Sequence, residues 1–114
     1  MENQREKTIK ILHEAFNLPI NAKPSIELLK LRKTLINEEA REVSEEIDKV
    51  ITKLEAQEEI PQELWADFLK ELADLQVVLS GTIISFEKFN KFDEAFERVQ
   101  ESNMSKLGED GKPI

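Results

Sequence analysis

Residues 26–57 contain no proline and no glycine, and this long uninterrupted stretch limits the fold more than any other feature of the sequence. Its apolar residues recur at spacings of three and four, which is typical of one face of an α-helix. These residues are Leu28, Leu31, Leu35, Val43, Ile47, Val50 and Leu54. The stretch therefore predicts one long helix, with Ser25 as its N-cap.

Three further segments show the same helical spacing. They are residues 4–17, 62–88 and 91–102. Pro61 precedes the second of these, at a place where proline suits the first turn of a helix. Gly81 lies inside the same segment and costs a helix about 1 kcal/mol relative to alanine, so we expect it to allow a close approach between helices. The apolar residues expected to face inward from the last segment are Phe92, Ala95, Phe96 and Val99.

This pattern predicts an all-α fold, an up-down bundle of about four helices with two long central ones. We assign residues 1–102 to a single helical domain and residues 103–114 to a polar C-terminal tail. Between Leu75 and Phe86 the third helix is apolar on nearly every side, and a bundle of 114 residues can cover only part of such a surface. We therefore expect a homodimer or homotetramer that packs these helices across its interface, with Trp65 either in the core or at that interface.

Composition excludes several classes of function. Twenty-four acids against sixteen bases give a net charge of −8, which is unsuited to the phosphate contacts of a DNA- or RNA-binding protein. The absence of cysteine excludes thiolate chemistry, and a single histidine excludes His-rich metal sites. The first residues are charged, and no apolar run approaches the roughly 18 residues of a membrane span. We expect a cytoplasmic protein with no membrane partner.

Two pairs of acids lie where a solvated surface does not explain them. Successive residues of a helix are about 100° apart, so Glu39 and Glu42 project from the apolar arc of the helix over residues 26–57. Glu71 and Asp74 share one face of the helix over residues 62–88. Burying four carboxylates together without a cation would be very costly.

We therefore expect a divalent metal ion to supply the compensating positive charge. The nearby bases, Arg41 and Lys70, are expected to point away from the acids. Ligands that offer only carboxylate oxygens suit Mg²⁺ or Mn²⁺. A di-iron site of the ferritin type is not expected, because the chain has no Glu-x-x-His motif. The alternative is that both acid pairs are ordinary exposed surface, since acids three residues apart are common on helices.

The same acids carry a resemblance to a known family. Residues 35–42, Leu-Ile-Asn-Glu-Glu-Ala-Arg-Glu, followed by Glu71-Leu-Ala-Asp74, resemble the Glu-Glu-x-x-Glu … Glu-x-x-Asp signature of the MazG-like all-α nucleoside triphosphate pyrophosphohydrolases. Residues 13–19 and 102–112 are similar to a subgroup of small phage and bacterial members described as phosphoribosyl-ATP pyrophosphohydrolase-like. Relatives of that subgroup often continue beyond the Asp-Gly-Lys stretch, so any substrate contact made by such an extension would be missing here.

The resemblance implies hydrolysis of a nucleoside triphosphate to a monophosphate and diphosphate, with water attacking the α-phosphorus. Glu39, Glu42, Glu71 and Asp74 would be the Mg²⁺ ligands, and Glu38 would position or deprotonate the water. A dedicated dUTPase or dCTPase and a phosphoribosyl-ATP pyrophosphohydrolase are the alternatives among enzymes. A non-catalytic helical interaction module is the alternative from another class.

Substrate contacts are expected from basic and polar residues outside the acid pairs. Cations that could meet a triphosphate are Lys106, Lys112, Arg32 and Lys91. Asn103 could read a base edge, although a role in capping the last helix is favoured. His13 and Phe16 could line a base pocket, although a surface histidine and a core phenylalanine are favoured.

Overall fold

The computed structural model describes residues 4–113, so residues 1–3 of the charged N-terminal segment and Ile114 of the tail lie outside it. The α-helices are α1 (Gln4–Ala15), α2 (Ile26–Glu55), α3 (Gln62–Ser85) and α4 (Phe92–Met104), with a 3₁₀ turn η1 (Glu87–Phe89) before α4. No strand occurs in the described part of the chain, which confirms the all-α class. Over the same residues, none of the helices is long and apolar enough to cross a membrane.

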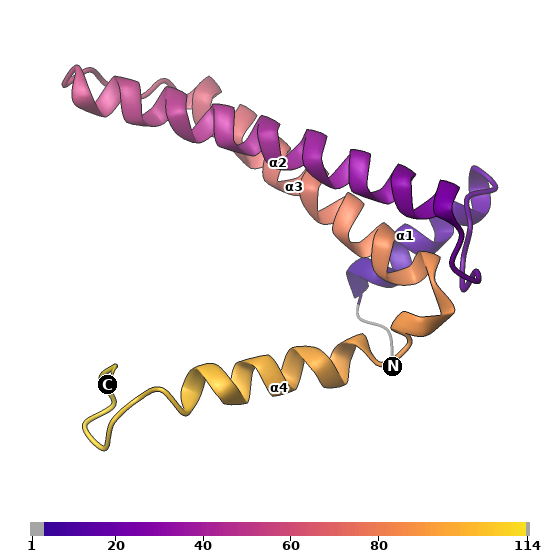
Figure 1. Ribbon diagram of the computed structural model, residues 1–114. Helices are drawn as coiled ribbons and strands as arrows, with labels where there is room; N and C mark the ends of the chain where they lie inside the picture. Colours follow the sequence, from indigo (N-terminus) through magenta and orange to yellow (C-terminus); the bar gives the residue numbers. More distant parts are fainter. Residues whose placement is uncertain (1–3, 114) are drawn as a thin grey trace.

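The two long helices α2 and α3 form an antiparallel hairpin (Figure 1). The hydroxyl oxygen of Ser25 accepts a hydrogen bond from the backbone nitrogen of Leu28 at 3.1 Å, which confirms Ser25 as the N-cap of α2. Gln57 adopts a left-handed backbone with φ of 57°, so α2 ends at Glu55 and the chain turns toward Pro61. The carbonyl of Pro61 accepts from Leu64 and begins α3.

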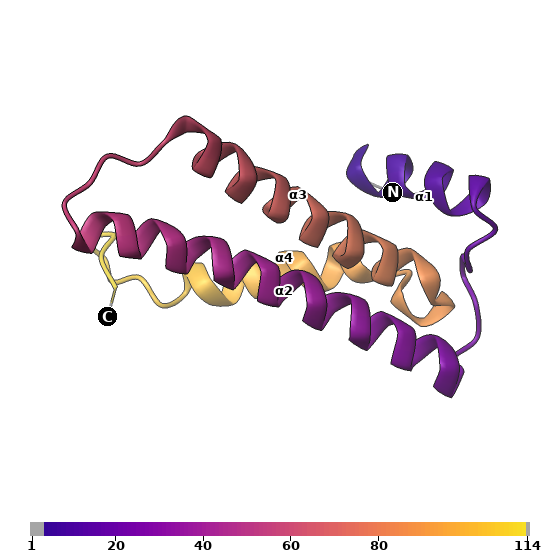
Figure 2. The same ribbon diagram turned by 90° about the horizontal axis from the view of Figure 1, so that it is seen from above.

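Helix α3 lies between α2 and α1 and contacts both (Figure 2). The loop after α1 pairs with the end of α3, where the nitrogen of Ala22 donates to the carbonyl of Ser85 at 2.7 Å and the nitrogen of Glu87 donates to the carbonyl of Ala22 at 3.0 Å. This pairing holds Phe86 in an extended conformation, with φ of −116° and ψ of 133°. Helix α3 therefore stops at Ser85, and the expected continuation to residue 88 is wrong.

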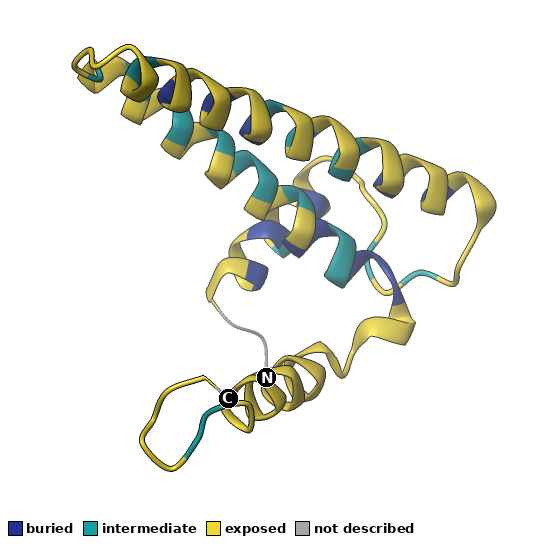
Figure 3. Cartoon of the chain, turned by 60° about the vertical axis from the view of Figure 1, so that its left-hand side comes forward, coloured by how far each residue is buried: buried dark blue, intermediate teal, exposed yellow. Residues whose placement is uncertain are grey.

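The core lies where α1, α2 and α3 pack against one another (Figure 3). Its buried hydrophobic residues are Ile9, Leu28, Val43, Val50, Ile84 and Phe86. The most deeply buried side chains are the small ones of Ser80 and Ser85, which permit close packing around the C-terminal half of α3. This is a slender core for a chain of 114 residues.

Helix α4 leaves the body of the protein and runs as a separate arm (Figure 1). Every residue of α4 is exposed, and 64% of Phe96 is accessible to solvent. The expectation that Phe92, Ala95, Phe96 and Val99 face inward is therefore wrong within one chain. The pairing at Phe86 directs the chain away from the bundle, so three helices pack together and the fourth does not.

Candidate metal centre

Three carboxylates meet across the α2–α3 hairpin. Glu39 and Glu42 are one turn apart on α2, and Glu71 faces them from α3. One carboxylate oxygen from each lies within 4.8 Å of the other two. The antiparallel hairpin thus brings together three of the four acids that the spacing of the sequence identified as metal ligands.

The cluster is partly buried and lacks enough hydrogen-bond donors. The Oε2 atoms of Glu39 and Glu71 are both buried, and no described residue gives either of them a hydrogen bond. The nearby carboxylate of Glu42 raises the pKa of Glu71, and burial raises it further. The carboxylate of Glu71 is therefore held where a proton or a cation would stabilise it.

The arrangement fits a small divalent cation. Magnesium binds carboxylate oxygens at about 2.1 Å in an octahedron, so two ligands of one ion are about 3.0 Å apart when adjacent and about 4.2 Å apart when opposite. The three oxygens lie within 4.8 Å of one another, so the side chains would have to rotate closer together to share one ion. A donor set made only of carboxylates favours Mg²⁺ or Mn²⁺ over softer ions.

Asp74, the fourth predicted ligand, is outside the three-carboxylate group and pairs with Lys70. The Lys70 Nζ atom lies 2.9 Å from Asp74 Oδ2 and 3.6 Å from Glu71 Oε1. The expectation that Lys70 points away is wrong, because a lysine reaches an acid four residues later on the same helix face. The Lys70 side chain is mostly exposed, so it can release Asp74 to solvent at little cost.

Glu46 is a buried acid that the sequence analysis missed. Its side chain is only 10% exposed, its Oε1 accepts a hydrogen bond from Lys49 at 2.8 Å, and its Oε2 is buried without a described partner. At 100° per residue, Glu46 points between the directions of Glu39 and Glu42. This angle could have identified Glu46 from the sequence as an acid that points in the same direction as Glu39 and Glu42.

The predicted water-activating residue, Glu38, is exposed on α2 immediately before Glu39. Its side chain is not one of the three that converge. It therefore stands beside the cluster rather than in it.

Arg32 is a structural residue in this fold. It is buried, its Nε donates to Thr82 Oγ1 at 2.9 Å, and its Nη2 donates to the carbonyl of Val78 at 2.8 Å. Burial lowers its pKa below the ordinary value of an arginine. These bonds connect α2 to α3. The guanidinium is therefore buried between the helices and is not exposed to contact a phosphate.

The predictions for His13 and Phe16 are reversed by the structure. His13 is 3% exposed and its Nδ1 donates to the carbonyl of Pro19 at 3.0 Å, whereas Phe16 is 68% exposed. Helix α1 ends at Ala15 and Asn17 takes a left-handed backbone, so Phe16 lies in the turn rather than on the packed face. The favoured surface histidine and core phenylalanine are both wrong.

Gly81 shows why a small residue is needed inside α3. A methyl group there would lie 2.7 Å from Arg32 Nη2 and 2.9 Å from His13 Nε2. Side chains from α2 and α1 therefore converge over Gly81, which confirms the expected close approach.

The remaining predicted contacts lie on α4 and the tail, across open space from the α2–α3 hairpin (Figure 1). Lys106 and Lys112 are exposed, as is Lys91 at the N-cap of α4. Asn103 lies within the last turn of α4 and Ser105 occupies the C-cap, so the capping role favoured for Asn103 is wrong. Within one chain, the structure does not bring these residues to the carboxylates.

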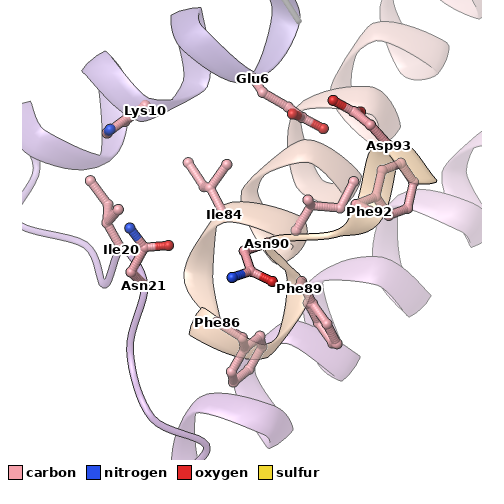
Figure 4. A pocket seen from close by; sticks show the side chains of 11 residues that line it. Glu6, Lys10, Ile20, Asn21, Ile84, Phe86, Phe89, Asn90, Phe92 and Asp93 are labelled. Atoms are coloured by element: carbon pink, nitrogen blue, oxygen red, sulfur yellow. The ribbon is translucent and has the colours of Figure 1, made fainter. Parts of the chain in front are cut away.

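A separate pocket of about 230 Å³ lies where α4 leaves the body (Figure 4). The rings of Phe86, Phe89 and Phe92 line it, together with the acids Glu6 and Asp93. Figure 4 shows Glu6 on α1 and Asp93 on α4 at the same side of the pocket. Lys10 lines it as well, so its charged lining is two acids and one base, which does not favour a phosphate.

No model of a known protein family matches the chain, and no curated protein matches it in sequence.

Proposed function

We propose that the chain is a MazG-like, Mg²⁺-dependent nucleoside triphosphate pyrophosphohydrolase, with Mn²⁺ as a possible replacement ion. It would convert a (deoxy)nucleoside triphosphate and water into the monophosphate and diphosphate. The observation that carries this proposal is the meeting of Glu39, Glu42 and Glu71, with two buried oxygens that lack hydrogen-bond donors. A protein of net charge −8 repels free polyanions, but it can take a nucleotide that arrives with its magnesium.

The residues have distinct roles in this proposal. Glu39, Glu42 and Glu71 would hold the ion, and Asp74 would add a fourth carboxylate if it were released from Lys70. A bound divalent ion supplies charge neutralisation at phosphate oxygens and a lower pKa for coordinated water.

By resemblance to the family signature, we assign Glu38 the role of activating the attacking water. Its carboxylate is exposed, lies next to Glu39 on α2, and is not one of the three that converge. It would orient the water and accept its proton as the bond to the α-phosphorus forms.

The cellular role we propose is control of the nucleotide pool or removal of unwanted nucleotides in the cytoplasm. The active unit in this proposal is a homodimer or homotetramer. The preferred base and sugar depend on contacts beyond the carboxylates, so the activity is tested on a full substrate panel.

The experiment incubates the purified chain with Mg²⁺ and each of the eight standard (deoxy)nucleoside triphosphates and with dUTP, and measures diphosphate and orthophosphate separately. We expect diphosphate and monophosphate in equal amounts. We expect Glu39→Gln and Glu71→Gln to lower turnover by about a hundredfold or more, because each removes a charge that holds the ion.

The matched control is Glu45→Gln on the same helix. Glu45 is exposed and pairs with Arg41 at 3.2 Å, outside the cluster, so this variant keeps full activity. Absence of diphosphate from every substrate with either Mg²⁺ or Mn²⁺ would overturn the proposal, as would full activity in the Glu39 and Glu71 variants.

A further inference from the structure

The carboxylate cluster of Glu39, Glu42 and Glu71 needs positive charge from the protein, as well as from a metal ion, to hold a strongly anionic triphosphate. The basic residues expected from the sequence do not supply it within one chain. Arg32 is buried between the helices, and the lysines at α4 and in the tail lie across open space (Figure 1). A basic residue that already lies beside the cluster is therefore the better candidate.

Lys70 on α3 is such a residue. Its Nζ atom lies 3.6 Å from Glu71 Oε1 and 2.9 Å from Asp74 Oδ2. By contrast, Lys53 on α2 pairs with Glu58, which lies outside the cluster at the far end of the hairpin. The ammonium group of Lys70 is thus within ion-pair distance of both α3 carboxylates of the proposed metal site.

The Lys70 ammonium group can change partner at little cost. Its side chain is 68% exposed, and exposed ion pairs contribute little to stability. The four-carbon stem is flexible, and the ammonium group has three hydrogen-bond donors. A hydrogen bond to Asp74 raises the pKa of Lys70, so the group stays charged at neutral pH. Lys70 therefore brings a mobile positive charge to the edge of the cluster.

We propose that Lys70 is a phosphate-binding residue of this site, a role that rests on the proposed function. Its ammonium group pairs with Asp74 and Glu71 while the site is empty, and donates to the phosphate chain of the nucleotide once those carboxylates are neutralised by the metal ion. An ammonium group binds most strongly to a partner that keeps its full negative charge. Metal ion and nucleotide therefore favour each other's binding through Lys70.

The alternative is that Lys70 only screens the repulsion between Glu71 and Asp74. In both cases its replacement by methionine removes a competitor of the metal ion. Only a phosphate contact predicts that the same replacement weakens the binding of a phosphate chain. The two effects have opposite signs, which a purely structural lysine does not produce.

The test titrates the full chain at saturating Mg²⁺ with bis-methylene triphosphate, an uncleavable analogue of inorganic triphosphate, in a calorimeter. This probe has no base or sugar, so the nucleotide preference does not affect it. We expect Lys70→Met to bind the probe about tenfold more weakly, because a charge-assisted hydrogen bond is lost. Lys70→Arg, which keeps the charge, should restore most of the affinity.

The matched control is Lys53→Met, which removes the same charge from a pair of the same 2.9 Å length at the far end of α2. It should bind the probe as the wild type does. Lys70 is exposed, so its variants should keep the helical signal in circular dichroism.

The salt dependence of binding provides a second readout. Added NaCl screens an ion pair between Lys70 and a phosphate. The dissociation constant of the wild type should therefore rise more steeply with NaCl than that of Lys70→Met, whereas Lys53→Met should follow the wild type.

The outcomes separate this inference from the proposed function. Unchanged probe binding in Lys70→Met, or no probe binding by the wild type, overturns the role of Lys70. If nucleotides still release diphosphate in that case, the proposed function stands without this residue. Probe binding that depends on Lys70, in a chain that releases no diphosphate from any nucleotide, supports the phosphate contact and overturns the proposed function.

Discussion

The carboxylates of Glu42 and Glu71 face each other across the antiparallel helices α2 and α3, and a hydrogen bond between them raises the pKa of Glu71. Two groups that repel when charged have been brought together by the hairpin. The pair therefore links the fold, the protonation state and the capacity to bind a cation.

The first prediction concerns stability against pH in the absence of divalent ions. The pKa of Glu71 lies above its ordinary value of 4.5 in the folded state, mainly because its protonated carboxyl donates a hydrogen bond to Glu42, and further because it is partly buried. The stabilising contribution of the protonated form is fully present below the unfolded-state pKa and is lost as pH rises through the folded-state pKa. From pH 4.5 to about 7, the wild type should therefore lose melting temperature relative to Glu71→Gln, which keeps the shape without the charge.

Glu45→Gln is the control for this pH series, because it removes an exposed carboxylate outside the cluster. The difference in melting temperature between Glu45→Gln and the wild type should stay constant over the same pH range. A wild type that gains stability relative to Glu71→Gln as pH rises would contradict the repulsion between Glu42 and Glu71.

The second prediction is that magnesium stabilises the fold. An ion that binds only the folded state raises the melting temperature by mass action. At neutral pH, 10-fold steps in Mg²⁺ concentration above the dissociation constant should each add about 1.4 kcal/mol to the free energy of unfolding. Glu39→Gln should lose most of this response. An equal response in that variant would place the ion elsewhere.

The third prediction concerns Lys70, which pairs with Asp74 and would compete with a bound metal ion for its carboxylate. Replacement by methionine, which removes the ammonium group but keeps a long side chain, should tighten Mg²⁺ binding by about three- to tenfold in a calorimetric titration without nucleotide. The control is Lys53→Met, which breaks a pair of the same 2.9 Å length with Glu58 at the far end of α2. Weaker binding in Lys70→Met would show that this lysine supports the site.

The fourth prediction tests the packing at Gly81. Alanine there should destabilise the protein by about 1–3 kcal/mol, because the overpacking against Arg32 and His13 outweighs the better helix propensity of alanine. Urea denaturation of Gly81→Ala measures the loss. The double variant with His13→Ala should lose less than the sum of the two single changes, since one obstacle to the methyl group is gone. Additive losses would argue against contact between these two positions.

Much of the fold follows from local rules. The spacing of apolar residues and the absence of proline and glycine predict the two long helices, and Ser25 predicts where α2 begins. The angle between residues on a helix predicts that Glu39 and Glu42 point into the hairpin, where Glu71 meets them. These features depend on residues close together in the chain or on a simple antiparallel pairing.

The features that sequence reasoning did not predict depend on contacts between distant segments. Helix α3 ends at Ser85 because Ala22 pairs with the chain there. No sequence pattern near Ser85 indicates that Ala22 is its partner. The same pairing sends α4 away from the bundle. His13 and Arg32 are buried because Gly81 leaves space for both, which becomes visible only when α1, α2 and α3 are assembled.

In the proposed reaction, water attacks the α-phosphorus of a nucleoside triphosphate beside the carboxylates of Glu39, Glu42 and Glu71. The most direct measurement is hydrolysis in ¹⁸O-labelled water with Mg²⁺, followed by mass spectrometry of both products. We predict one labelled oxygen in the monophosphate and none in the diphosphate, at a rate that Glu39→Gln abolishes. Label in diphosphate or in orthophosphate, or no hydrolysis at all, would contradict the account.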